Sequence, residues 1–213
     1  MKTILKILLI ILFFTNVTFA QFPIVRTVSY EQSRLINYDH QKGDYIKDIN
    51  NQLDPYVGTW KYIGTDKILT LKLTRVNEFL LKAPNNSPNA YYGYFDEIVL
   101  TYKLEDNSGN IIFDSTNLPN VTQHTDGYGG FLNGKEDSNY INGVFKDFTK
   151  MVSVARCEIT KVATPAGQPE KIYFELFENH SMPLINPATG ERYVDYIPGQ
   201  LYSVPNRIEL IKQ

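Results

Sequence analysis

Side chains that usually carry catalytic or metal chemistry are few in this sequence and widely spaced. The three histidines, His40, His124 and His180, have no carboxylate partner at ligand spacing, so a metal site would need a coincidence of the tertiary fold. Ser181 follows His180, but neighbouring side chains of an extended chain point to opposite faces, and no nucleophile-elbow pattern is present. The sequence therefore predicts no catalytic residue, metal or cofactor, and it favours a binding protein over an enzyme.

One acidic side chain interrupts an otherwise apolar strand face. Between positions 92 and 105, the residues of one phase are mostly apolar and those of the other phase are mostly polar, as a half-buried antiparallel strand requires. Asp96 is therefore the predicted ligand contact, and Tyr92, Tyr94 and Tyr102 are predicted to present hydroxyls to the same ligand. A bulge near the strand end that reverses the face is the alternative explanation. The apolar face reads Tyr92, Tyr94, Asp96, Ile98, Leu100, Tyr102 and Leu104.

The elements that must position these residues are predominantly strands. From position 56 onward the hydrophobic period is two, and polar turn sequences separate the segments. The predicted strands are 60–64, 69–74, 78–82, 92–105, 109–115, 140–148, 151–162, 172–176 and 207–212. Eight or nine such strands predict an all-β, antiparallel barrel or sandwich over residues 56–213. The Pro-rich segment 181–205 cannot be a central strand and is predicted to be a long loop that could cover one end.

The segment before the strands, residues 21–55, has a different pattern. Tyr45, Ile46, Ile49 and Leu53 recur at spacings of one, three and four, and Asp44 stands at a suitable N-cap position. These residues predict a short helix within 44–53. The stretch before it, 22–30, is either a strand or a loosely held lead.

The first twenty residues have the features of a cleaved signal peptide. Lys2 and Lys6 form a positive start, positions 7–14 are continuously apolar, and Ala20 precedes the expected cleavage before Gln21. Eight apolar residues are far fewer than the ~20 that span a bilayer. We therefore expect a secreted or periplasmic protein with no membrane span.

The charge and cysteine content narrow the possible partners. Without Lys2 and Lys6, 19 of the 21 basic residues face 23 acidic ones, giving a net charge of −4. Acidic and basic residues alternate without a basic cluster, which disfavours nucleic-acid binding. The single cysteine, Cys157, excludes an intrachain disulfide and is expected to be a buried, small apolar residue.

A short motif at the start of the strand series suggests a family resemblance. Gly58-Thr59-Trp60 resembles the Gly-x-Trp of the lipocalin-like (calycin) superfamily, in which a late basic residue packs across the indole. The resemblance implies that Gly58, Trp60 and Arg207 are structural, with Trp60 closing one end of a barrel and the guanidinium making a cation–π contact. Arg156 is the alternative cation. The longer string 45–60 resembles an uncharacterised family of small secreted bacterial proteins, which implies a fold but no function.

These observations lead to two hypotheses of different classes. The first is a lipocalin-like barrel of about 8–9 strands with a short N-terminal helix, which binds a small, largely apolar ligand in its interior. The alternative is a barrel without a cavity that acts as a protein–protein interaction, inhibitor or adhesion module.

Overall fold

The chain folds almost entirely into β-strands. In this computed structural model, the residues that the structure describes are 22–82, 91–117, 130–134, 139–150, 152–177, 181–183 and 202–213. The only α-helix among them is α2 (Tyr30–Ser33), and η1 (Asp54–Tyr56) is a single 3₁₀ turn. The all-β prediction is confirmed. The strands are β1 (Arg26–Ser29), β2 (Asp44–Lys47), β3 (Gly58–Ile63), β4 (Lys67–Lys82), β5 (Tyr92–Asp106), β6 (Ile111–Asp114), β7 (Gly130–Gly134), β8 (Tyr140–Asp147), β9 (Val152–Val162), β10 (Lys171–Leu176), β11 (Ser181–Pro183) and β12 (Ile208–Lys212).

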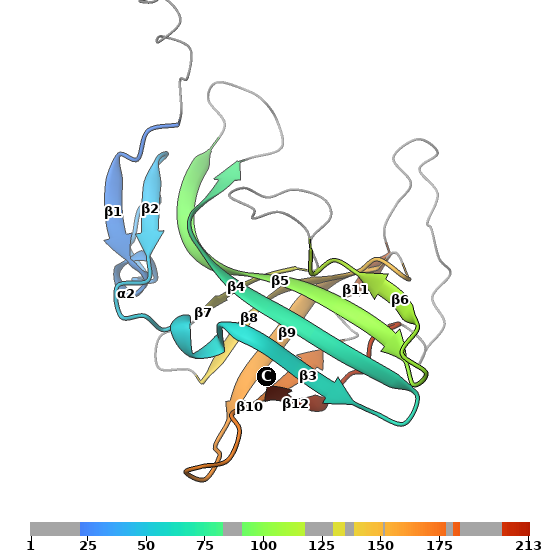
Figure 1. Ribbon diagram of the computed structural model, residues 1–213. Helices are drawn as coiled ribbons and strands as arrows, with labels where there is room; N and C mark the ends of the chain where they lie inside the picture. Colours follow the sequence, from blue (N-terminus) through green and yellow to red (C-terminus); the bar gives the residue numbers. More distant parts are fainter. Residues whose placement is uncertain are drawn as a thin grey trace, which may run out of the picture.

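All twelve strands belong to one mixed sheet (Figure 1). Their order is β1-β2-β5-β4-β3-β12-β10-β9-β8-β7, with β6 beside β5 and β11 beside β9. β7 also pairs with β5, so it has a strand on each side. Most pairs are antiparallel, but β1–β2 and β2–β5 are parallel, so the prediction of a purely antiparallel sheet is wrong for the N-terminal strands. The chain returns through α2 and residues 34–43 before β2 begins, which is the long crossover that a parallel pair requires.

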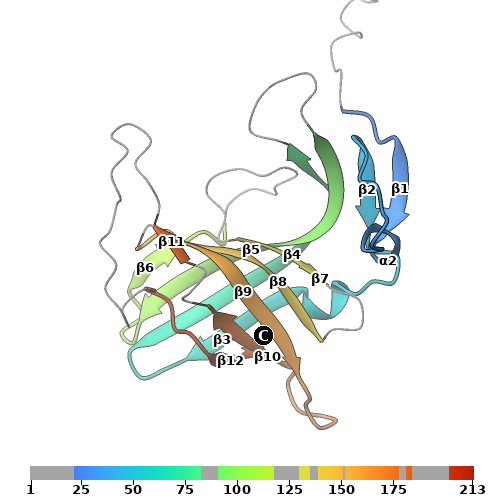
Figure 2. The ribbon, with the colours of Figure 1, turned by 180° about the vertical axis from the view of Figure 1, so that it is seen from behind.

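The two longest strands divide the molecule into two regions. The register of β4 against β5 shifts between Val76 and Phe79, where a bulge places Glu78 at φ 55°. Beyond this bulge the strands curve away from β9, β10 and β12 and lie beside β1 and β2 (Figures 1 and 2). We call residues 22–54, with the ends of β4 and β5 beyond the bulge, the N-terminal extension. The remaining described strands form the body.

The helix predicted within 44–53 is wrong. Residues 44–47 form strand β2, which lies between β1 and β5 and buries Asp44, Tyr45 and Ile46 in succession. Since side chains of both phases are buried, β2 is covered on both faces and reads as a continuous buried run, which a short window does not distinguish from one helix face. The helix is α2 instead. It begins with a capping box in which Ser29 accepts the Gln32 N–H and the Gln32 side chain accepts the Ser29 N–H.

Most strands of the body lie where the sequence predicts them. The predicted segments 69–74 and 78–82 form the single strand β4, and β7 and β11 were not predicted. The signal peptide (residues 1–20), His124, His180 and most of the loop 181–205 lie outside the described residues. Pro183 ends β11, which pairs with β9 off the main strand path. No helix among the described residues is long and apolar enough to cross a membrane.

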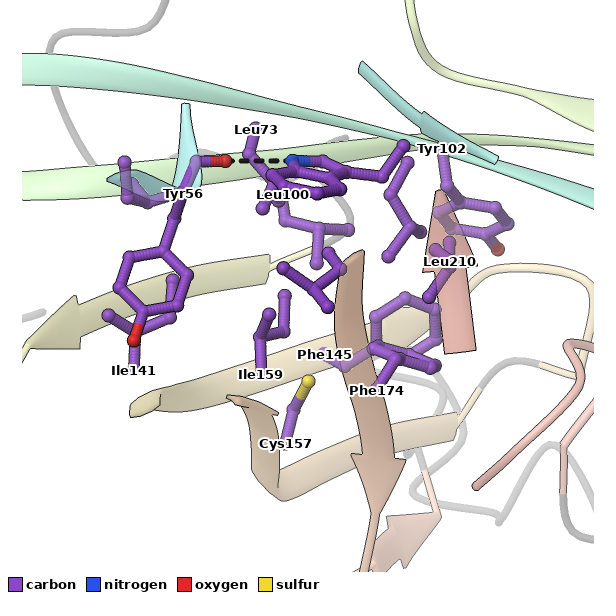
Figure 3. Packing of buried hydrophobic residues seen from close by; sticks show 14 of the residues in the cluster. Tyr56, Leu73, Leu100, Tyr102, Ile141, Phe145, Cys157, Ile159, Phe174 and Leu210 are labelled. Carbon is purple, nitrogen blue, oxygen red and sulfur yellow. Dashed lines mark hydrogen bonds between the residues drawn. The ribbon is translucent and has the colours of Figure 1, made fainter. Parts of the chain in front are cut away.

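The inward-facing side chains of the body form one apolar core (Figure 3). Leu69, Leu71 and Leu73 alternate along β4 and are almost completely buried, as are residues from six other strands and Leu53 at the end of the extension. Cys157 is buried among them as a free thiol, and its burial raises its pKa. The other fully or nearly fully buried members are Leu53, Trp60, Ile98, Leu100, Tyr102, Leu104, Ile141, Phe145, Ile159, Ile172, Phe174, Leu176 and Leu210.

Candidate functional site

The predicted ligand contact Asp96 lies at the junction between the extension and the body. It is completely buried on β5, directly opposite the bulge in β4. Its Oδ1 accepts a hydrogen bond from the Tyr45 hydroxyl at 2.6 Å and from the Glu78 N–H at 3.4 Å. Its Oδ2 accepts from the Asp48 N–H at 3.0 Å and from Arg75 at 3.3 Å. The bulge is in β4 and not in β5, so Asp96 keeps the phase of Ile98.

Arg75 links three carboxylates at this junction. Its guanidinium lies 3.3 Å from Asp96, 3.7 Å from Asp48, and in direct contact with Asp54. Burial disfavours the charge on Arg75, but the hydrogen bond to Asp54 and the neighbouring carboxylates outweigh it, so the pKa of Arg75 is raised. Tyr45, between β1 and β5, also has a raised pKa, first through burial and then through its bond to Asp96. The contacts of this cluster are therefore made among its own members, which are one guanidinium, three aspartate side chains and the Tyr45 hydroxyl.

The three predicted tyrosines do not gather around Asp96. Tyr92 donates its hydroxyl to the carbonyl of Pro23 at 3.0 Å, and Tyr94 donates to the carbonyl of Phe22 at 2.5 Å. Tyr102 lies in the body, where its hydroxyl accepts the Phe148 N–H at 3.2 Å. The tyrosine whose hydroxyl binds the Asp96 carboxylate is Tyr45, which the predicted helix would place on a different element. All four hydroxyls bind this chain itself, so a ligand at Asp96 would have to displace one of these bonds.

A second buried carboxylate, Asp44, fixes the outer part of the extension. It accepts two hydrogen bonds from Arg26 at 2.9 and 2.8 Å, one from the Tyr38 hydroxyl at 2.5 Å and one from the Gln41 N–H at 2.9 Å. Burial alone would raise the pKa of Asp44, but these donors prevail and lower it to about 2. The position after Gly43 in the sequence signals a polar cap, but it does not reveal Arg26 as the partner.

A third buried carboxylate, Asp147, performs the same task in the body. It ends β8 and accepts hydrogen bonds from both the N–H and the hydroxyl of Ser203, at 2.5 and 2.6 Å. Its Oδ1 also accepts the N–H groups of Thr149 and Lys150. Lys67 donates to the Ser203 carbonyl at 2.7 Å. Asp147 therefore anchors the segment that leads into β12.

The Gly-x-Trp motif occupies the end of the body next to the extension. Trp60 is fully buried and donates its indole N–H to the Tyr56 carbonyl at 2.8 Å, the bond dashed in Figure 3. The cation over the ring is Lys212, whose Nζ lies 5.3 Å from the ring centroid. Gly58 has φ 140°, and a Cβ there would lie 3.2 Å from Lys212 Cε. Glycine is therefore required at position 58 both for its backbone conformation and for the space that Lys212 fills.

The expected pairing of Arg207 with Trp60 is wrong. Arg207 is exposed and binds Glu175 at 3.1 Å, because it precedes β12 on the outward phase. Lys212 is the register partner of Trp60 on β12 and therefore lies on the face of the indole. The alternative cation, Arg156, binds Glu158 and lies over the Phe177 ring at 4.3 Å. The motif is thus completed by a residue five positions beyond the predicted one.

The buried polar residues of the described chain form no group of metal-ligand geometry. The buried carboxylates Asp44, Asp96 and Asp147 each accept hydrogen bonds from groups of this chain, and these contacts hold segments of the fold together. No curated protein and no solved structure shows significant similarity to the chain. The sequence pattern of a family of unknown function (DUF6705) matches residues 1–213, and the chain therefore belongs to that family.

Proposed function

We propose that this protein is an exported binding module, a lipocalin-like β-barrel that is filled by its own side chains and acts on a protein partner through its surface. The observation that carries this proposal is the packing of the inward face. Leucines from β4 and β5 meet aromatic residues from β8 and β10, and all are buried (Figure 3). Side chains already fill the interior of such a small barrel, so it would recognise a partner protein through its outer surface.

The pairing of β7 supports closure of the strands into a barrel. Following hydrogen-bonded neighbours from β5 through β4, β3, β12, β10, β9 and β8 leads to β7, which pairs again with β5 at Ile98–Leu100. Eight strands make a barrel whose interior is just wide enough to be filled by side chains. In such a barrel we expect Trp60 to close one end, which is what the lipocalin-like resemblance implies.

Export is the other part of the proposal. It is based on the positive start, the apolar run and Ala20 at the end of residues 1–20. After expression with its natural start, intact-mass measurement of periplasm and medium should find a chain beginning at Gln21. An uncleaved chain that remains in the cytoplasm would remove the exported part of the proposal.

Titration with a fluorescent fatty-acid probe tests the filled interior directly. The mature wild-type protein should show no saturable binding, because buried side chains already occupy the inward face. A Phe174→Ala variant, in which a buried ring is deleted, is the control for a void in the core and should bind benzene, which the wild type should not. Stoichiometric, saturable binding to the wild type would overturn the packed-interior proposal.

One observation favours the second candidate, a barrel that binds a small, largely apolar ligand. Tyr56 is only 3% exposed, and among the described residues its hydroxyl has no hydrogen-bond partner. The hydroxyl points toward Ile141 (Figure 3), and burial raises the pKa of Tyr56 to about 12. A polar group on a ligand would satisfy it.

Tyr56→Phe separates the two candidates. If the interior is filled, deletion of an unsatisfied hydroxyl should leave the free energy of unfolding unchanged or raise it, by up to about 1 kcal/mol. If a ligand binds there, the variant should instead lose a co-purifying small molecule seen by native mass spectrometry of the wild type. Retention of such a molecule by both proteins would exclude Tyr56 as its contact.

A further inference from the structure

The hairpin of β5 and β6 ends in a short strand, β6, which lies at an edge of the sheet that the structure describes. β6 pairs with β5, and no other strand in the described part of the chain pairs with it. The turn between them is firmly built, because Asp106 accepts hydrogen bonds from the N–H groups of Ser108 and Asn110, both at 2.9 Å. On the inward side, Phe113 packs against Tyr102 with ring centroids 4.8 Å apart. Phe113 and Ile111 are the register partners of Leu104 and Glu105, so Ile112 is the extra residue of a bulge in β6, and the bonded turn and the Phe113 contact hold this edge in place.

The side chains that border this edge are unusually apolar for a surface. Ile111 is 61% exposed and Ile112 is 45% exposed. The same outward row continues across the sheet, because Ile111 is the register partner of Glu105, Glu105 of Ile68, and Ile68 of Ile63. Ile63 is 71% exposed. A partner strand that covered β6 would remove these isoleucine side chains from water, which favours binding.

The charge around β6 distinguishes between possible partners. Residues 105–117 contain three acids, Glu105, Asp106 and Asp114, and no lysine or arginine. Three lysines close to these acids are engaged: Lys103 pairs with Glu105 at 3.0 Å, Lys72 donates to the Thr116 carbonyl at 3.4 Å, and Lys67, the register partner of Asp106, donates to the Ser203 carbonyl at 2.7 Å. Two copies of this edge would bring acidic ends together, whereas a basic segment would be attracted.

We propose that the free edge of β6 binds an extended segment of a partner protein, one with apolar side chains at alternate positions and basic residues at its ends. The segment adds a strand to the sheet, so main-chain hydrogen bonds hold it and the exposed isoleucines select its side chains. This inference rests on the proposed function of a surface-acting module and names the site and the chemistry of the partner.

Three synthetic peptides test the proposal against the mature protein. The first reads Lys-Val-Thr-Val-Thr-Val-Lys, the second has glutamate in place of both lysines, and the third carries N-methyl groups on alternate amides. The basic peptide should bind, with amide chemical-shift changes centred on residues 111–114. The acidic peptide should bind about tenfold more weakly because of charge repulsion. The N-methylated peptide should not bind, because it cannot complete the strand pairing.

Matched protein variants locate the site. Ile112→Lys should weaken binding of the basic peptide by at least about tenfold, since a lysine protects a strand edge. Ile36→Lys is the control, because Ile36 is 99% exposed and lies in the extension. Equal loss in both variants, equal binding of the N-methylated peptide, or a dimer abolished by Ile112→Lys would each overturn the β6 proposal. Failure of all peptides would also overturn it, whereas the packed interior of the proposed function is tested separately and fails if the wild-type interior binds the fatty-acid probe.

Discussion

The body and the N-terminal extension are stabilised by different kinds of contact. In the body, long antiparallel strands repeat the same backbone pairing residue after residue, and the inward side chains are almost all apolar. The extension uses short strands of four residues, and three of the four buried aspartates in the described chain, Asp44, Asp48 and Asp96, lie in it or where it joins β5. Its apolar contribution to the core is confined to a few residues such as Val28 and Ile46.

This difference has a consequence for how each region responds to a single change. In the body, many backbone hydrogen bonds and apolar contacts are shared among neighbouring strands, so it should unfold cooperatively. A local defect there should lower the free energy of unfolding of the whole body. The extension is attached through a few polar contacts, and removing one partner leaves the other charge buried and unpaired. We therefore expect body variants to lower global stability and junction variants to release the extension selectively.

The largest expected effect is in the body. Phe174→Ala deletes a fully buried ring that lies 5.7 Å from the ring of Phe145, and should lower the free energy of unfolding by about 3–5 kcal/mol. Urea unfolding followed by tryptophan fluorescence reports it, because Trp60 belongs to the same core. Ile36→Ala, at a fully exposed position, should change the value by less than about 0.5 kcal/mol. A loss below about 1 kcal/mol for Phe174→Ala would contradict a close-packed interior.

The next largest effect is expected at the junction. Asp96→Asn removes the charge opposite Arg75 and turns one acceptor into a donor, which should cost about 2–4 kcal/mol. Hydrogen exchange should accelerate in β1 and β2 while the amides of β9 and β10 stay protected. Asp147→Asn is the matched control, because it should instead loosen the segment at Ser203. Uniform acceleration in both regions would mean that the extension and the body unfold as one unit.

The body was largely predictable from the sequence because apolar and polar residues alternate within each long strand. A period of two over many residues predicts which face of a strand is buried. The composition of residues 106–110 alone predicts the turn that the structure has there. The missed strand β7 shows the limit, since Gly130–Gly134 contains two glycines and is too short to alternate clearly. Its position between β5 and β8 is a tertiary fact with no local signature.

The extension and its junction were poorly predictable because their structure depends on contacts between residues that lie far apart in the sequence. Asp44, Tyr45 and Ile46 of β2 are buried in succession, on both faces of the strand, so the alternation that marks a half-buried strand is missing. The partners of Asp96 come from positions 45, 48, 75 and 78, and no local pattern joins them. The capping box at Ser29 and Gln32 was the one local signal that could have located the true helix.

Acid should act on the extension through Asp44. Its folded pKa of about 2 lies below the ordinary value of 3.8, so its contribution is present above about pH 4 and is lost as the pH falls toward 2. Because Arg26 is partly exposed, the contribution should be on the order of 1–2 kcal/mol. The unfolding free energy of wild type and Asp44→Asn, measured from pH 6 to pH 2, should converge at the acid end. A constant difference across that range would show that the Asp44 charge is not what stabilises β2.

The smallest expected effect concerns the end of the body that faces the extension. Lys212→Met keeps an alkyl chain over the indole but removes the cation 5.3 Å from the Trp60 ring, so about 0.5–1 kcal/mol should be lost. Lys212 also forms an ion pair with Glu170 at 2.7 Å, and the variant Glu170→Gln measures the contribution of this ion pair to the free energy of unfolding separately. Arg207→Met should cost less than Lys212→Met, because Arg207 holds only an exposed pair with Glu175. If the order were reversed, Arg207 would be the cation that stabilises the Gly-x-Trp motif, and the register of β12 against β3 would have to shift to bring it there.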